Sequence, residues 1–177
     1  DKLEQAQRSA IVRPVDLAGT ILAYEEFETV KKELLNDNDF AYFDKGGKMV
    51  DKGSGNGYIK KSGWRKIKTA FGISISLDDG RRTPGQDSEG QYYVWRYKTR
   101  AITPNGIYQD ADGACSSRKA FFSKKYGKRV DPDEEDIILM AQTVAMNRVI
   151  SDLVGGGEVS AEEMYGRDEV KPEVRQQ

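Results

Sequence analysis

The sequence contains no histidine and a single cysteine, Cys115. The absence of histidine excludes Ser-His-Asp and Cys-His catalysis, and it removes the imidazole groups that most transition-metal sites use. One cysteine cannot form a disulfide within the chain, and we expect a cytoplasmic protein of a prokaryote or of a virus in its host cell. The first residues lack a signal-peptide core, and no apolar run is expected to span a membrane.

The sequence also lacks a nucleotide-binding loop. Residues 53–57 (GSGNG) are rich in glycine, but they are not followed by the GK[ST] ending of a P-loop, so ATP binding is not expected. Cys115 has no histidine partner and is expected to be a small packed residue. We therefore expect a protein that is not an enzyme and that holds neither a cofactor nor a metal.

Positive charge is concentrated in the middle of the chain. The 177 residues are 37% hydrophobic and 32% charged, which suits one soluble domain with a core. The net charge is −1, but residues 58–129 hold sixteen Lys and Arg against six Asp and Glu, whereas the remainder holds twelve against twenty-three. A basic middle between acidic ends is typical of a protein that binds a polyanion. Alternatively, the two sets neutralise each other across the fold.

Periodicity and turn signals predict a single α+β domain. We expect an N-terminal arm over 1–15, the domain over 16–165 and a flexible tail over 166–177. The expected elements are helices over 16–36 and 61–71, a small hairpin over 40–52, strands over 72–77, 91–103 and 107–112, a polar loop over 78–90, and a short helix or turn over 113–128. They predict a curved antiparallel three-stranded sheet, with the small hairpin beside it, packed against a long buried helix as a β-β-β-α core.

The stretch 133–158 supplies that long helix. It begins with four acids, Asp133 to Asp136, which suit a helix N-terminus, and it ends at three glycines that suit a C-cap. Most residues between them are apolar, so the helix must be buried on most sides. Thr143, Asn147 and Ser151 form one polar stripe, with Arg148 beside it. This stripe is either a solvent-facing strip with a surface salt bridge or the wall of a groove, facing strand 91–103, in which Arg148 receives an anion.

The strand over 91–103 has two unlike faces. Tyr93, Trp95, Tyr97 and Thr99 alternate with Val94, Arg96, Lys98 and Arg100. A core does not tolerate three unpaired cations, so this basic face is either a solvated surface that blocks aggregation or a phosphate track. As a track it would be continued by Arg65, Lys66 and Lys68 of the second helix. The aromatic face either stacks bases or, as we expect for Trp95, belongs to the core.

The order of these motifs resembles that of a known superfamily. Helix 61–71 ends in Phe-Gly and leads into three strands, the third strand ends in Asp110-Ala111-Asp112-Gly113, and a basic connection leads to the long helix with Thr143, Asn147 and Arg148. Over residues 24–157 the chain resembles the single-strand annealing proteins, which include the eukaryotic recombination annealing protein, the mitochondrial nucleoid annealase and phage recombinases. The terminal GGGEVSAEE is similar to archaeal or viral relatives.

The resemblance implies a fold that assembles into rings or helical arrays, with single-stranded DNA in a continuous groove and recombination proteins as partners. It implies ATP-independent annealing of complementary strands in recombination or repair. In such proteins the long helix contributes a basic pair to the groove; here the matching positions are Asn147 and Arg148, so only one is cationic. Lys98, Arg100, Arg65 or Lys66 would supply the missing charge. A second DNA contact is expected at Arg81, Arg82, Arg118 and Lys119.

Two other classes stay open. A structural or assembly protein of a virion or plasmid would use the basic face only to pack against an acidic neighbour. A metal-dependent nuclease would use Asp110 and Asp112, although a two-metal site needs several converging carboxylates and such pairs are more often turn residues.

Overall fold

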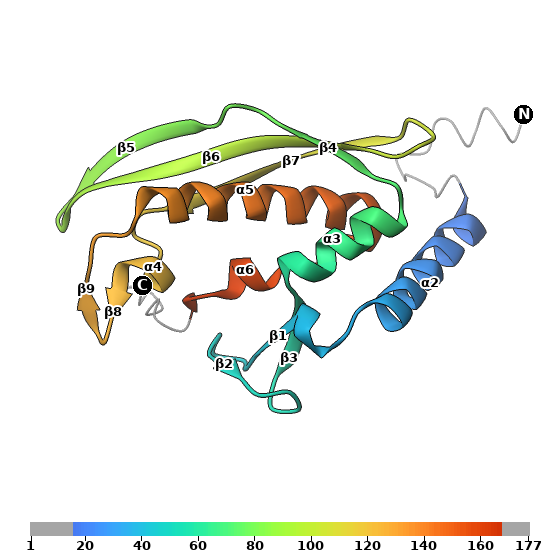
Figure 1. Ribbon diagram of the computed structural model, residues 1–177, viewed down its shortest axis with the longest axis horizontal. Coiled ribbons are helices and arrows are strands. Elements are labelled where there is room, and N and C mark those ends of the chain that lie inside the picture. The colour runs from blue at the N-terminus through green and yellow to red at the C-terminus, as the bar shows by residue number, and fades with distance from the viewer. Residues whose placement is uncertain (1–15, 168–177) are drawn as a thin grey trace, which may run out of the picture.

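The computed structural model describes residues 16–167, so the expected arm over 1–15 and all but the start of the expected tail lie outside the described residues. Its elements, in chain order, are α2 (Leu17–Leu34), η1 (Asp37–Asp39), β1 (Phe40–Phe43), β2 (Met49–Val50), β3 (Asn56–Ile59), α3 (Lys61–Ala70), β4 (Ser74–Leu77), β5 (Arg81–Asp87), β6 (Gly90–Ile102), β7 (Tyr108–Ser116), α4 (Ala120–Ser123), β8 (Lys124–Lys125), β9 (Lys128–Arg129), α5 (Glu134–Ile150), η2 (Ser151–Gly155) and α6 (Ala161–Met164). The α+β class is confirmed. A curved antiparallel sheet lies over α5, and the remaining helices and a small sheet lie on the far side of α5 (Figure 1).

The main sheet is built around β6. Strand β7 pairs with one side of β6, while β4 and β5 follow each other along its other side. The polar loop expected over 78–90 is therefore wrong, because residues 81–87 form strand β5 and only a short turn remains before Gly90. The sequence did not predict β5, because Pro84 argues against a strand. Proline is tolerated at this position because β5 is an edge strand.

A β-bulge separates β4 from β5. Leu77 pairs with Thr99 and Arg81 with Arg96, so three residues on one strand oppose two on the other. The Asp78 carboxylate holds this bulge by accepting hydrogen bonds from the backbone N–H groups of Gly80 (3.1 Å) and Lys98 (3.0 Å). Gly80 has φ +75°, and a side chain there would come within 2.4 Å of the Tyr97 ring, so the bulge requires glycine.

Helix α5 forms the core of the molecule. Asp133 caps it by accepting a hydrogen bond from the N–H of Glu135 (3.0 Å), as the acidic start predicted. One side packs on Tyr97 and Cys115 of the sheet, and the other, at its C-terminal end, packs on α3 and α2. By length and hydropathy alone Glu134–Gly155 is long and apolar enough to cross a membrane, which the sequence analysis did not recognise. More than half of it is buried inside the protein, as in the core helix of a soluble protein.

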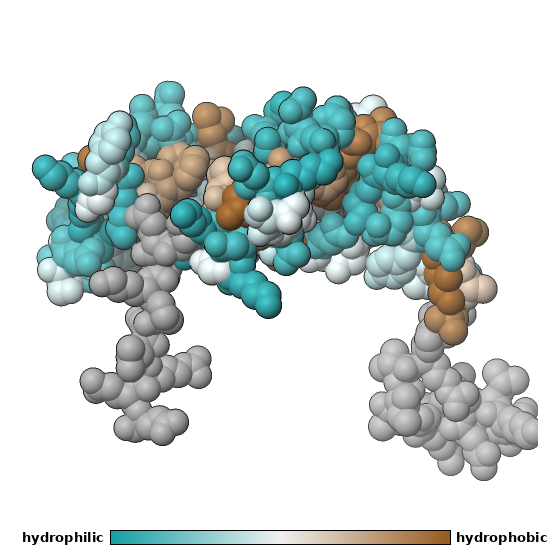
Figure 2. Space-filling model, turned by 90° about the horizontal axis from the view of Figure 1, so that it is seen from below, coloured by the Kyte–Doolittle hydropathy of each residue, from teal (hydrophilic) through white to brown (hydrophobic). Residues whose placement is uncertain are grey.

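Contacts of α3, α2 and the small sheet complete the packing. Trp64 of α3 is fully buried, donates a hydrogen bond from Nε1 to the Ile59 carbonyl (3.1 Å), and lies in one cluster with Phe27 of α2. The small sheet, in the order β2-β1-β3, packs through Phe43 against α6. Helix α2 is the least covered helix, and its exposed large side chains are Leu17, Ile21, Leu22 and Tyr24. Figure 2 shows a brown, hydrophobic surface at one end of the molecule.

Candidate nucleic-acid interface

The outer face of the main sheet carries the basic ladder. Along β6, Arg96, Lys98 and Arg100 are exposed, whereas Tyr97 and Thr99 between them are buried towards α5. The alternation expected for this strand is confirmed. Trp95 belongs to the aromatic, helix-facing side, packs in the core beside α5, and donates from Nε1 to the Glu134 carboxylate (2.8 Å).

Acidic residues of β7 neutralise one half of the ladder. Arg100 makes a bidentate pair with Asp110, at 2.6 and 2.8 Å, and Lys98 lies directly opposite Asp112. The hydrogen bonds from Arg100 hold the pKa of Asp110 below its usual value. Both carboxylates thus face cations across the strand pair, and among residues 16–167 no three Asp, Glu or Cys side chains gather as a metal site would need.

The other half of the ladder has no such compensation. Arg81 of β5 lies directly opposite Arg96, so both guanidinium groups stand on the outer face. Within residues 16–167 neither arginine makes an ion pair, and both are exposed. Like charges directly opposite each other destabilise a strand pair, so this position favours an external anion between the two side chains.

The cations of α3 do not continue the ladder. Helix α3 packs below the sheet with Ala101, whose side chain points away from the face that carries Lys98 and Arg100. Lys66 is instead bound to the buried Asp39 carboxylate (2.6 Å). The expected single track from Arg65, Lys66 and Lys68 to strand 91–103 is therefore wrong, because the core lies between the two sets (Figure 1).

The polar stripe of α5 is buried and turned away from the basic face. Thr143, Asn147 and Ser151 are each at most 5% exposed. Asn147 donates from Nδ2 to Glu162 (3.0 Å), and Ser151 donates to the Glu158 carbonyl (2.8 Å). Neither the solvent-facing strip nor the wall facing strand 91–103 is correct: the stripe lies under the segment that contains α6.

Arg148 lies beside this stripe at the outer edge of β7. Its Nε donates to Glu163 (2.6 Å), and its terminal nitrogen donates to the Asp112 carbonyl (3.1 Å). The guanidinium side chain is 47% exposed while the paired Glu163 side chain is 9% exposed. Arg148 thus receives an anion, as the groove hypothesis required, but that anion is a carboxylate of the same chain.

The second expected contact set does not form one surface. Arg82 points to the helix side, where it pairs with Glu134 (2.7 Å) and lies over the Tyr93 ring. The Lys119 side chain is half-buried and donates to the Glu162 carbonyl (2.6 Å), and this desolvation lowers its pKa. Of the four residues in this set, Arg81 stands on the outer face of the sheet opposite Arg96, and Arg118 lies over the ring of Tyr92 near the β5–β6 turn.

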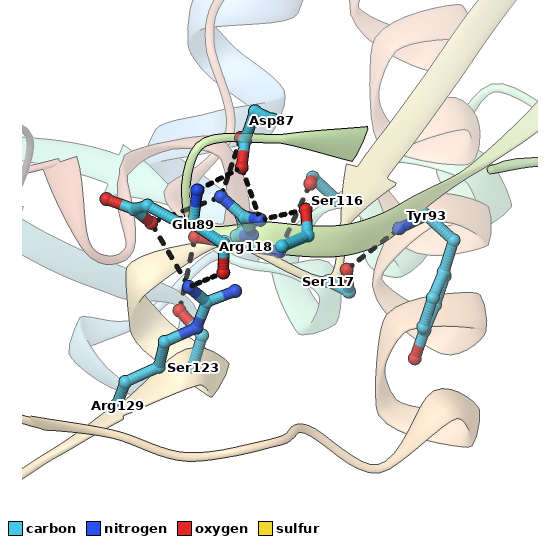
Figure 3. A network of polar contacts seen from close by, with 9 residues as sticks. Asp87, Glu89, Tyr93, Ser116, Ser117, Arg118, Ser123 and Arg129 are labelled. Carbon is cyan, nitrogen blue, oxygen red and sulfur yellow. Dashed lines mark hydrogen bonds and ion pairs between the residues drawn. The ribbon is translucent and has the colours of Figure 1, made fainter. Parts of the chain in front are cut away.

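Arg118 is committed to the β5–β6 turn. Its two terminal nitrogens donate to both oxygens of Asp87 (2.7 Å each), and one of them donates to the Gly90 carbonyl (2.9 Å). Glu89 of the same turn accepts from Arg118 and from Arg129, at 3.1 and 3.2 Å (Figure 3). This network fixes the free end of the longest hairpin, so Arg118 has a structural role that its charge alone did not predict.

Two features of the structure were not predicted from the sequence. A cleft of about 610 Å³ lies against the hairpin of β5 and β6, and its polar lining includes Arg82, Tyr93 and Arg129. The β8–β9 hairpin carries Tyr126, fully exposed with φ 52°, between Lys125 and Lys128. The Tyr-Gly pair between cations was the available signal for the hairpin. The cleft had none, because it depends on where the segment before α5 lies.

Cys115 is packed as expected. It belongs to the cluster under α5, and burial raises the pKa of its thiol to about 11.

Comparison of the chain with protein-family models and with curated proteins finds no match in either set.

Proposed function

We propose that this protein binds single-stranded DNA and anneals complementary strands without ATP or metal. The observation that carries the proposal is the uncompensated Arg81–Arg96 pair on an open sheet face. Two guanidinium groups side by side form a site for phosphate, whose oxygens accept their hydrogen bonds. Lys98 stands on the same face of β6 next to this pair, although Asp112 lies opposite it. The excess of cations over residues 58–129 and the order of motifs support the same proposal.

The proposal includes assembly into a homo-oligomeric ring or helical array, on which neighbouring sheet faces would form a continuous path for DNA. Affinity is expected to arise mainly from phosphate contacts and so to fall steeply with salt. Bases that are not held by the protein remain free to test pairing with a second strand.

Binding is tested by fluorescence anisotropy with a labelled single strand over a range of salt concentrations. The double substitution Arg81→Ala and Arg96→Ala is expected to weaken binding about tenfold and to reduce the slope of log K against log salt by roughly 1.4, because each lost phosphate contact removes about 0.7. The matched control is Lys45→Ala with Lys48→Ala, which removes the same charge from the exposed β1–β2 turn. Equal losses in both variants would show that only net charge matters and that the sheet face is not the interface.

Annealing is tested with complementary strands in the absence of nucleotide and divalent cation, beside electron microscopy of the same sample. Assembly that ignores DNA, with no annealing, would favour the structural protein that packs on an acidic neighbour. Shortening of the labelled strand on addition of magnesium would favour the nuclease.

A further inference from the structure

Helix α6 occupies the space between α5 and β1 (Figure 1). The first and last residues of α6, Ala161 and Met164, are buried against Ala41 and Phe43 of β1. The two residues between them are both glutamates. A four-residue helix with an apolar anchor at each end thus presents two adjacent carboxylates to the body of the protein.

Glu162 accepts hydrogen bonds from three other segments of the chain. Its carboxylate accepts from the backbone N–H of Lys61, at the start of α3 (2.7 Å), and from Asn147 of α5 (3.0 Å). Its main-chain carbonyl accepts from Lys119, the residue before α4 (2.6 Å). Burial raises the pKa of this carboxyl and lowers the pKa of the Lys119 ammonium, so neither charge gains from being there.

Glu163 takes the neighbouring position. It accepts from Arg148 (2.6 Å) with one oxygen and from the N–H and hydroxyl of Ser160 (3.0 Å each) with the other. The donors that surround α6 are therefore a helix N-terminal N–H, an amide, an ammonium and a guanidinium. These are the groups with which proteins hold phosphate oxygens. A helix required only for packing could fill the same space with apolar side chains at no cost in buried charge.

We propose that α6 is an intramolecular competitor for DNA. The carboxylates of Glu162 and Glu163, with the main-chain carbonyl of Glu162, occupy a site formed by Lys61 N–H, Asn147, Arg148 and Lys119, and this site takes the phosphodiester backbone of a single strand when α6 moves out. This inference rests on the proposed function and adds a mode of regulation to it. It also explains how Asn147, the uncharged member of the expected pair, takes part in binding an anion.

The connection between α5 and α6 permits this movement. Gly156 and Gly157 have φ +70° and +85° and link the two helices without side chains that would restrict the backbone. Besides the hydrogen bonds to the four donors, the movement breaks the Lys31–Glu158 pair (2.7 Å) and the Ser151 hydrogen bond to the Glu158 carbonyl. It also exposes Ala161 and Met164 and separates the Tyr165 ring from Phe43 and Phe121. Neither the main sheet nor α5 has to rearrange.

The test compares single-strand affinity of the wild-type chain with that of Glu162→Gln plus Glu163→Gln. These amides keep the shape of α6 but weaken its hold on the donors, so binding is expected to become about tenfold tighter. The control is Glu25→Gln plus Glu33→Gln on the exposed side of α2, which changes net charge equally at a distance. Thermal melting reports whether each variant folds. If the double variant does not fold, Glu163→Gln alone is measured in its place, because it keeps Glu162 as the acceptor for the Lys61 N–H.

The outcomes separate this inference from the function beneath it. If wild type binds and the α6 variants bind no tighter than the α2 control, α6 is not a competitor, while the DNA-binding proposal stands. If no variant binds DNA at low salt, the proposed function fails and this inference with it. Hydrogen exchange gives an independent result: single-stranded DNA is expected to speed amide exchange over residues 158–165 in the wild-type chain, and slower exchange there would overturn the competition.

Discussion

Replacing Gly113 by alanine is expected to force α5 away from the main sheet. A methyl group built at Gly113 would lie 2.1 Å from the backbone nitrogen of Ala145 and 2.6 Å from the carbonyl oxygen of Ala141. Both contacts are with the backbone of α5, which cannot turn aside as a side chain can. The strand or the helix must therefore shift by roughly 1 Å along their whole contact.

The magnitude follows from the cost of overpacking. Adding a methyl group to a well-packed core costs about 1–3 kcal/mol, and the upper end applies here because the obstacle is backbone. For a domain of this length each 1 kcal/mol lowers Tm by about 2–4 °C, so Gly113→Ala is expected to lower Tm by roughly 6–12 °C. Thermal unfolding followed by circular dichroism measures the shift, and urea unfolding measures the free energy of unfolding independently.

Gly46→Ala provides the matched control. Its methyl group would meet only an Asp44 carboxylate oxygen, at 3.3 Å, on an exposed turn, so its effect is expected to stay within about 0.5 kcal/mol. If Gly113→Ala melts at the wild-type temperature, the close packing of α5 on β7 is refuted, and with it the account of how the sheet is held.

The remaining predictions concern titrating groups. Although burial alone raises the pKa of Asp39, hydrogen bonds from Lys66, Asn36 and Ser62 hold it below its usual value. The contribution of Asp39 to stability is therefore fully present above a pH of about 4 and is lost as the pH falls through the lowered pKa. Asp39→Asn is expected to lower the free energy of unfolding by about 1–2 kcal/mol at pH 7. Urea unfolding at decreasing pH is then expected to show a smaller loss of stability in the variant than in the wild type, and an equal loss would contradict this. The Cys115 thiol, with a pKa of about 11, is expected to react with a thiol reagent at pH 8 only as fast as the protein opens, and rapid labelling of native protein would show that it is not buried.

Much of the fold follows from local signals in the chain. The acidic start of α5 and the end of α3 at Phe71-Gly72 lie where the sequence predicted them. Each depends on neighbouring residues alone. The alternation of β6 was also predictable, because three cations in a strand leave only one face for the core.

The candidate site was less predictable, since it depends on contacts between distant segments. Periodicity identified the stripe of Asn147 on α5, but nothing local showed that Glu162 would cover it. Charge identified Arg118, but only the position of the β5–β6 turn shows that Asp87 and Glu89 use that charge. The same is true of α3, whose cations were expected on the ladder although Trp64 directs the helix to the other side of the core.

The bulge between β4 and β5 separates the register of the two strands. One residue between Leu77 and Arg81 is left over when Leu77 pairs with Thr99 and Arg81 pairs with Arg96. Loss of a single codon for residues 78–80 would remove that extra residue, and Arg81 would still oppose Arg96 on the outer face. Straightening the bulge at the present length would instead move Arg81 opposite Trp95 and turn it toward the core. For a lineage carrying this gene, a one-residue deletion here would therefore keep the charge of the sheet face, whereas a substitution of Gly80, which the bulge requires, would put it at risk.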